Sequence, residues 1–158
     1  MVKETSIEIS GIGFSAGHFV SEGGKCERLH GHNYQVSVRI SGEINSQGMV
    51  IDFRVIKEHL RLLCKEWDHR LLLPAYSSQI KISARGEKTE VKTPDREYSF
   101  PSKDVLILDV TETTAEELAR ILAQRLGEIL KQNFPNVHQI GLSVAESITQ
   151  RATVVIDL

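Results

Sequence analysis

The sequence of residues 1–158 predicts a single α+β domain, in which two helices pack on one face of a four-stranded antiparallel sheet. Three observations predict this class. Four segments alternate apolar and polar residues, and two segments repeat apolar residues at spacings of three and four. The segments follow the order strand, strand, helix, insert, helix, strand, strand. A four-stranded sheet leaves two open edges, which favours pairing with other copies of the chain.

The first two strands form the N-terminal part of the predicted sheet. Residues 4–14 alternate, and Gly11 and Gly13 indicate a bulge after which the apolar residues continue on the other parity. Residues 19–29 form a loop. Residues 32–41 alternate clearly, as a half-buried strand does, so we expect this strand to lie antiparallel to the first.

Two helices are predicted with their caps. Asp52 is a suitable N-cap for a helix that runs to about Asp68. Thr114 and Glu117 have the spacing of a capping box, and the second helix ends near residues 133–136. Apolar residues on one face of the first helix are Phe53, Ile56, Leu60, Leu63 and Trp67.

The remaining segments comprise an insert and the last two strands. Residues 76–104 contain two short strand-like runs on either side of residues 93–96, which predicts an exposed hairpin. Residues 105–110 form an apolar run that we interpret as a short extended segment. Alternation then predicts strands over residues 140–144 and 152–158.

Composition excludes several classes of partner. The net charge is -2 and the pI is near 6.3, with no stripe of basic and aromatic residues, so we expect no nucleic acid partner. No apolar run approaches the roughly 20 residues that span a bilayer, so we expect no membrane partner. Residues 1–5 are polar and lack the apolar stretch of a signal peptide, which predicts a cytoplasmic protein. We interpret Cys26 and Cys64 as free thiols.

Three histidines form a candidate metal site. His30 and His32 open the second strand, and side chains two residues apart on a strand point to the same face. His18 ends the first strand and would lie beside them if the two strands pair. Neutral imidazoles suit zinc, and three protein ligands leave a fourth position open, as in catalytic sites. For a histidine taken alone, a solvated loop position is the favoured interpretation, and the third histidine at the end of the neighbouring strand strengthens the case for a metal site.

Cys26 stands four residues before His30 in a loop rich in glycine and charge. Beside a zinc dication a thiol gains thiolate character, and it could then act as a base or nucleophile. It could also become a fourth zinc ligand and close the site. A passive loop cysteine is the remaining alternative.

Further candidate residues are an acid–histidine pair and an isolated carboxylate. Asp68 can orient the imidazole of His69, although an ordinary helix C-terminus explains the pair equally well. Glu146 shares the parity of the apolar residues in the 140–144 strand, where a carboxylate needs a partner. That partner could be the paired donors of a guanidine-like ligand edge, or Arg151.

Together, these residues resemble the 6-pyruvoyltetrahydropterin synthase family. The matching groups are Phe14-Ser15-Ala16-Gly17-His18, Cys26-x-x-x-His30-Gly31-His32-Asn33-Tyr34, Asp52-Phe53, Trp67-Asp68-His69-Arg70-Leu71, Thr114-Ala115-Glu116 and Ala145-Glu146. They occur in the family order and cover the chain except for roughly residues 76–104. Two departures are a longer insert and Glu112-Thr113, where many relatives have Asn-Pro.

The resemblance implies the tunnelling fold and its assembly. In that family three subunits join their four-stranded sheets into a barrel, two trimers stack into a homo-hexamer, and the active sites lie between subunits. The resemblance also implies a Zn²⁺ cofactor held by His18, His30 and His32. Zinc would acidify the positions next to the hydroxyl groups that it binds.

The same resemblance implies roles for five further residues. Cys26 resembles the catalytic thiol, and Asp68 and His69 resemble its acid–base partners. Glu146 resembles the residue that anchors the pterin ring, and Thr114 lies nearby in the pterin pocket. These assignments follow from the family motifs, not from spacing.

The implied substrate is 7,8-dihydroneopterin triphosphate, and the implied activity is that of a lyase. One branch of the family makes 6-pyruvoyltetrahydropterin. Another also releases acetaldehyde and makes 6-carboxy-5,6,7,8-tetrahydropterin, a precursor of the 7-deazaguanine nucleosides queuosine and archaeosine. The short gap between Cys26 and His30 resembles the carboxy branch, which we favour. A non-catalytic, zinc-stabilised oligomer that binds pterin or purine is a further alternative.

Overall fold

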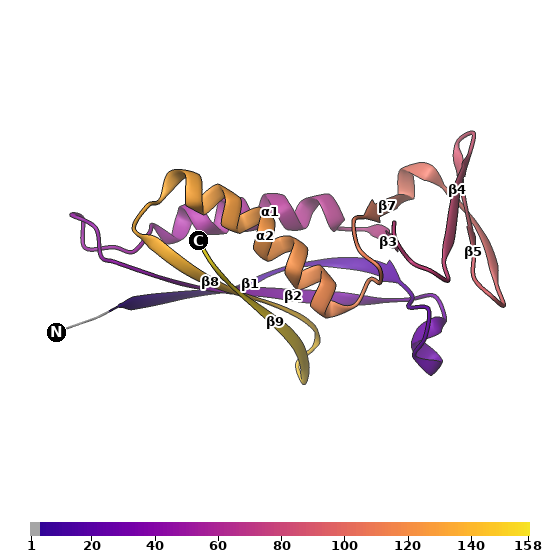
Figure 1. The fold of residues 1–158 in the computed structure, drawn as a ribbon, viewed down its shortest axis with the longest axis horizontal. Helices are drawn as coiled ribbons and strands as arrows, with labels where there is room; N and C mark the ends of the chain where they lie inside the picture. The colour runs from indigo at the N-terminus through magenta and orange to yellow at the C-terminus, as the bar shows by residue number, and fades with distance from the viewer. Residues whose placement is uncertain (1–3) are drawn as a thin grey trace.

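A computed structural model describes residues 4–158, which fold into two α-helices and two separate β-sheets. The larger sheet has six strands in the order β7-β3-β1-β2-β8-β9. Helices α1 (Phe53–Trp67) and α2 (Ala115–Asn133) lie side by side on one face of this sheet, and the smaller sheet projects at one end of the molecule (Figure 1). The α+β class and the position of both helices agree with the sequence prediction.

The four predicted strands form the centre and one edge of the large sheet. β1 (Thr5–His18) pairs antiparallel with β2 (His30–Gly42), and the pairing shifts by one residue between Ile9 and Ile12, where the bulge was predicted. β8 (Val137–Ser147) pairs antiparallel with β2, and β9 (Gln150–Asp157) pairs antiparallel with β8. Each of these strands extends beyond the alternating core from which it was predicted.

The prediction of a four-stranded, purely antiparallel sheet is wrong. β3 (Arg70–Pro74) pairs parallel with β1, and β7 (Val105–Leu108) pairs parallel with β3. The sheet of the described residues is therefore mixed and has six strands. β3 is short, and four consecutive residues of it are buried, so it lacks the alternation that identifies a half-exposed strand.

The insert is a three-stranded antiparallel sheet, not a simple hairpin. It comprises β4 (Lys81–Arg85), β5 (Lys88–Lys92) and β6 (Glu97–Pro101), and the turn between β5 and β6 lies at the predicted residues 93–96. The 3-10 turn η2 (Ser102–Asp104) leads back to β7. One face packs on a small apolar cluster that consists of Phe19, Leu71, Leu73, Ile80, Val91 and Val105.

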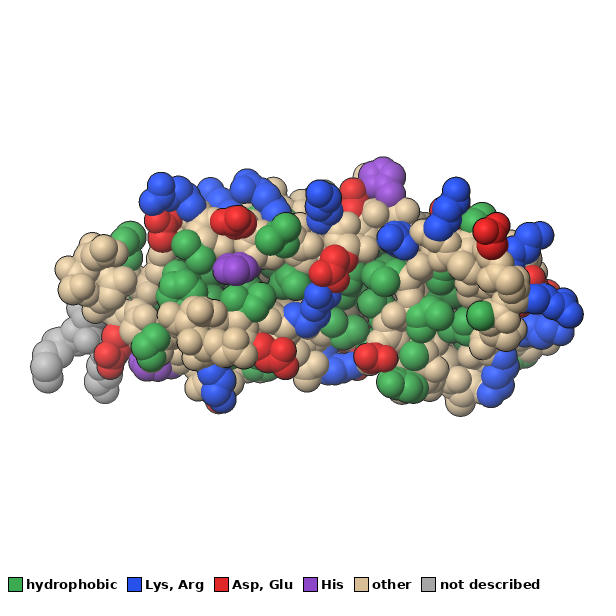
Figure 2. Space-filling view, turned by 90° about the horizontal axis from the view of Figure 1, so that it is seen from above, with side chains coloured by type: hydrophobic (Ala, Val, Ile, Leu, Met, Phe, Trp, Pro, Cys, Tyr) green, Lys and Arg blue, Asp and Glu red, His purple; other side chains and the backbone are tan. Residues whose placement is uncertain are grey.

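The main core lies between the helices and the large sheet. Asp52 caps α1 by accepting a hydrogen bond from the Arg54 amide at 2.8 Å, and Thr114 caps α2 by accepting one from the Glu117 amide at 3.4 Å. Both predicted caps are confirmed. From the helix side, apolar side chains lie between charged ones, and blue basic side chains gather at the outer end of the insert (Figure 2). Among the described residues, no helix is long and apolar enough to cross a bilayer.

Candidate active site

The three predicted metal-binding histidines lie together at one end of the large sheet. Strand pairing places His18 opposite His30 and Ala16 opposite His32, so the imidazoles share the face that the helices cover. One ligand atom from each histidine lies within 4.8 Å of the others. The backbones of β1 and β2 approach closely here. A Cβ added to Gly31 would lie only 2.9 Å from the Ala16 carbonyl oxygen.

Backbone carbonyls set the tautomers of two imidazoles. His18 Nδ1 lies 2.8 Å from the Thr113 carbonyl oxygen, and His30 Nδ1 lies 2.6 Å from that of Arg28. A carbonyl can only accept, so each Nδ1 carries the proton and each Nε2 presents a lone pair. Within residues 4–158, both Nε2 atoms are buried without a hydrogen-bond partner. A metal ion would satisfy both.

The electrostatics of the cluster also fit a metal ion. Burial lowers the pKa of His18 to about 4, with the neighbouring imidazoles His30 and His32 adding to this effect. Burial likewise lowers the pKa of His32, although Glu146 opposes the shift. Neutral imidazole is the form that binds a divalent metal. The donor set and its protonation therefore fit zinc.

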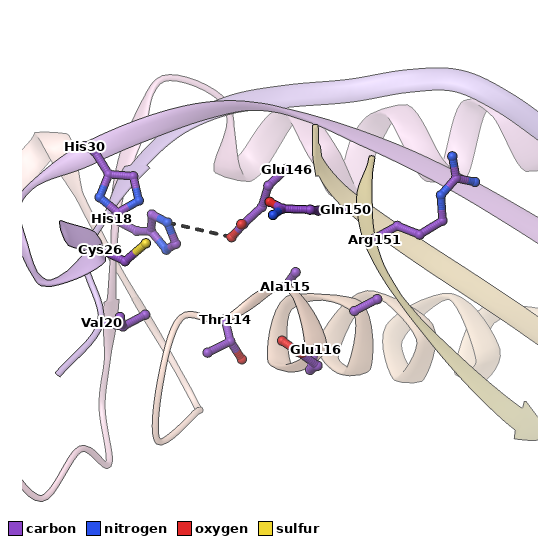
Figure 3. A pocket seen from close by; sticks show the side chains of 11 residues that line it. His18, Val20, Cys26, His30, Thr114, Ala115, Glu116, Glu146, Gln150 and Arg151 are labelled. Carbon is purple, nitrogen blue, oxygen red and sulfur yellow. Dashed lines mark ion pairs between the residues drawn. The ribbon is translucent and has the colours of Figure 1, made fainter. Parts of the chain in front are cut away.

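A cavity of about 280 Å³ adjoins the cluster and gathers the other candidate residues. Cys26, Thr114 and Glu146 line it together with His18 and His30 (Figure 3). Cys26 is half-buried on the 3-10 turn η1 (Gly24–Glu27), and its thiol is free. Among the described residues, the group of clustered metal-ligand atoms consists of the three imidazoles and does not include the Cys26 sulfur.

Glu146 faces the histidines instead of Arg151. Its Oε1 lies 3.9 Å from Nε2 of His18 and 3.9 Å from Nε2 of His32, and its side chain is 25% exposed. Gln150 and Arg151 also line the cavity, and Figure 3 shows Gln150 beside Glu146 and the Arg151 guanidinium pointing away from Glu146. The carboxylate is therefore open to a ligand in the cavity, and the pairing with Arg151 that the sequence left open does not occur.

Asp68 and His69 lie outside this cavity. The Asp68 carboxylate accepts a hydrogen bond from the Ser15 amide at 2.8 Å and lies 2.9 Å from His69 Nδ1, and these contacts lower the pKa of Asp68. His69 adopts the left-handed conformation, with φ 59°, and its side chain is 82% exposed. It lines an open groove of about 560 Å³ with Ser15 and Asn33. His30 and His32 line this groove too, so His69 shares a groove with two of the clustered histidines but does not line the cavity that holds Cys26 and Glu146.

Sequence reasoning missed the contribution of residues 112 and 113. Thr113 is fully buried, its carbonyl binds His18, and its hydroxyl donates to the Phe19 carbonyl at 3.2 Å. Glu112 accepts hydrogen bonds from the backbone and the hydroxyl of Ser21. A backbone carbonyl has no sequence signature, so the Thr113 contact could not be predicted from residue type.

The fold and this site define an enzyme of the tetrahydropterin synthase class. The model of the family described as 6-pyruvoyl tetrahydropterin synthase matches residues 8–156, and the chain belongs to this family. Enzymes of this family act on pterins, so the sequence resemblance is confirmed.

Similar proteins carry two different product names. A relative from Methanocaldococcus jannaschii, provisionally named a 6-carboxy-5,6,7,8-tetrahydropterin synthase, is 36% identical over 145 residues, which cover 90% of this chain and 89% of the relative. The Bacillus subtilis protein of that name is 38% identical over 95 residues, covering 58% of this chain and 53% of that protein. A solved structure of Plasmodium vivax 6-pyruvoyltetrahydropterin synthase, a variant with its catalytic glutamate replaced by alanine, is 32% identical with a TM-score of 0.92, covering 99% and 100% of the two chains.

Proposed function

We propose that this chain is a zinc-dependent lyase that, with uptake of one water molecule, converts 7,8-dihydroneopterin triphosphate to 6-carboxy-5,6,7,8-tetrahydropterin and releases triphosphate and acetaldehyde. The observation that carries the proposal is the cavity in which Cys26, Glu146 and the imidazoles of His18 and His30 meet. The names of the sequence relatives and the short gap between Cys26 and His30 support the carboxy product.

Each residue has a role that follows from its place. His18, His30 and His32 would hold the zinc ion, which when bound supplies Lewis acidity to the hydroxyl groups of the substrate side chain. The Glu146 carboxylate accepts hydrogen bonds from the N–H donors of the pterin ring. Cys26 lines the same cavity and exchanges a proton with the substrate side chain.

The second proton-transfer group comes from a neighbouring copy of the chain. His69 does not line the Cys26 cavity of its own chain and its side chain is 82% exposed, yet Asp68 holds its ring in place. The edge strands β7 and β9 expose Ile107 and Val155, which suits edge-to-edge assembly. We propose a homo-hexamer in which His69 of one subunit serves the Cys26 cavity of another.

The pyruvoyl product is the alternative with a specific observation in its favour, namely the strong structural likeness to the Plasmodium vivax enzyme. That enzyme is described with a catalytic glutamate. In this chain Glu27 adjoins Cys26, but its carboxylate accepts hydrogen bonds from the amides of Gly23 and Gly24, both at 3.1 Å. The thiol, not this carboxylate, lines the cavity, which favours Cys26 as the proton-transfer group.

Mass spectrometry of the product from 7,8-dihydroneopterin triphosphate tests the proposal. The carboxy product has lost two carbon atoms as acetaldehyde, so the two products differ in mass. Cys26→Ala should retain zinc and lose turnover by about 10²- to 10⁴-fold, because a general acid–base group contributes an effect of that size. Cys64→Ala is the matched control, since Cys64 is buried in the core away from the cavity.

Three outcomes would change the proposal. A product of the pyruvoyl mass would establish the alternative branch. Absence of turnover by the zinc-loaded oligomer, with pterin still bound, would favour the non-catalytic binding protein. Spectroscopic evidence of sulfur coordination in a cobalt-substituted protein would indicate a closed four-ligand site that includes Cys26.

A further inference from the structure

The loop that carries Cys26 has its own internal hydrogen bonds. It joins β1 to β2 over residues 19–29, and the amide of Val20 donates to the carbonyl of Cys26 at 3.1 Å. The Glu27 carboxylate binds two glycine amides within the same loop, as described above. Gly24 has φ +64°, a conformation that glycine adopts without strain. These contacts shape the loop but do not attach it to the rest of the protein.

Glu112 attaches the loop on one side. Its carboxylate accepts one hydrogen bond from the Ser21 amide at 3.1 Å and another from the Ser21 hydroxyl. Glu112 directly precedes Thr113, which holds His18, and Thr114, which lines the cavity. A single three-residue segment therefore contacts the thiol loop, a metal ligand and the cavity wall.

The insert makes a second set of contacts with the loop. Arg96 donates from Nη1 to the Glu27 carbonyl at 3.4 Å, and Gln79 donates to the Glu22 carboxylate at 2.8 Å. The ring of Tyr98 packs against that of Phe19, with 5.3 Å between centroids. Arg96 is only 31% exposed, so its bond to the residue next to Cys26 is partly shielded from water.

We propose that Glu112 and Arg96 are positioning residues that clamp the Cys26 loop at two points, Ser21 before the thiol and Glu27 after it, and that the three-stranded insert serves to hold the thiol at the cavity. Each residue acts through the loop backbone. Loss of either clamp releases the loop, raises the accessibility of Cys26 and takes the thiol out of its position beside the substrate. The kinetic consequence rests on the proposed function, whereas the accessibility of the thiol does not.

Alkylation of the zinc-loaded oligomer with iodoacetamide, read at each cysteine by mass spectrometry, is the first test. Glu112→Ala and Arg96→Ala should each speed alkylation of Cys26 by about ten-fold, because local opening controls access of the reagent. Cys64 serves as an internal reference, since burial raises the pKa of its thiol to about 12 and keeps it unreactive. Hydrogen exchange should rise over residues 20–28 and stay unchanged in α1.

The matched controls are Arg85→Ala and Glu128→Ala. Arg85 is exposed in the insert, and Glu128 is exposed on α2. Arg85→Ala removes a positive charge, as Arg96→Ala does, and Glu128→Ala removes a negative charge, as Glu112→Ala does. Neither substitution removes a contact with the loop. Ser21→Ala should give a smaller effect than Glu112→Ala, because it removes the hydroxyl donor and leaves the amide donor, and the double variant should be no faster in alkylation than Glu112→Ala alone. Glu112→Gln should rescue partly, because an amide keeps one acceptor oxygen.

Turnover is the second test. The clamp variants should lower kcat by about ten- to hundred-fold with little change in KM, because the thiol is displaced while the pterin anchor Glu146 remains. Unchanged alkylation and exchange in both clamp variants would overturn the positioning role, whatever the turnover. If Cys26 is alkylated faster in the Glu112 and Arg96 variants but the wild-type protein never turns over the pterin substrate, the positioning role is supported and the proposed reaction is rejected. If Arg96→Ala fails to fold, Arg96→Lys, which keeps the charge but lacks the guanidinium, carries the test of the Arg96 contact.

Discussion

The histidine cluster and the Asp68–His69 pair differ in how completely one chain builds them. His18 has a side chain that is 3% exposed and a ring nitrogen fixed by a buried carbonyl, whereas the side chain of His69 is 82% exposed. Both are nevertheless ordered by specific hydrogen bonds. Asp68 holds His69 from one side, and the His69 amide donates to the Ser15 carbonyl at 2.6 Å.

This difference separates a site that is formed within the fold from a pair that, in our proposal, acts in a neighbouring subunit. An exposed left-handed residue costs free energy of order 1 kcal/mol or more, which a chain keeps only where the surroundings or the function require it. The His69 backbone carries this cost without giving the ring access to its own cavity. The arrangement is the one expected for a group that acts across a subunit boundary.

The largest expected difference between the two groups is in zinc binding, which should depend on His30 and not on His69. His30→Ala should weaken zinc binding by at least about a hundred-fold and reduce turnover below detection, because the ion loses one of three protein ligands. His69→Ala should keep about one zinc per chain. Metal analysis after dialysis against a weak chelator measures both, with His59→Ala on α1 as the control. Loss of zinc from the His69 variant would place that imidazole in the metal site.

Mixing two inactive variants should restore part of the activity. Cys26→Ala and His69→Ala each lack one proton-transfer group, but a site shared between subunits can combine the intact group of each. Random co-assembly should return about a quarter of wild-type activity. Each site is active only when the subunit that supplies Cys26 has an intact thiol and the neighbour that supplies His69 has an intact imidazole, and each condition is met in half of the cases. Mixtures of Cys26→Ala with Cys26→Ser should stay inactive. Failure of the first mixture, with co-assembly demonstrated, would confine the site to one chain.

The smallest expected effect is the pH dependence of the free energy of unfolding, which should report the burial of His18. The pKa of His18 is lowered from 6.5 to about 4, so between these values the unfolded chain binds a proton that the folded chain does not. The free energy of unfolding of the metal-free protein should therefore fall as the pH drops, by at most roughly 2 kcal/mol from pH 7 to pH 5. Urea unfolding at one chain concentration measures this. His18→Gln should show a shallower slope, and an unchanged slope would contradict the assignment.

Local patterns predicted the elements that are half exposed. Both helix caps, the bulge near Gly11 and the antiparallel pairing of β1 with β2 follow from side-chain periodicity and capping chemistry. The histidine cluster was predictable for the same reason, because strand register converts sequence spacing into spatial proximity. Cys26 was connected with that cluster by its position four residues before His30, whereas Glu146 required the family motifs.

The sequence could not show features that depend on burial or on backbone contacts. β3 and β7 are short apolar runs whose parallel pairing has no periodic signature. The clamp formed by Glu112 and Arg96 joins segments far apart in the chain through ordinary surface residue types. The separation of His69 from Cys26 depends on the path of the chain after α1, which residue order alone does not fix.

The bulge in β1 also governs which deletions this site can survive. Its extra residue lies between Ile9 and Ile12, well before His18. Because the bulge places two residues of β1 opposite one residue of β2, deleting its extra residue would make the pairing regular and keep His18 on its present face, whereas deleting two residues would turn His18 to the opposite face of the sheet. A descendant of this protein could thus retain every metal ligand in its sequence and still be unable to bring them together. The alternation of side chains along β1 and the histidines themselves can change independently, and the metal site requires both.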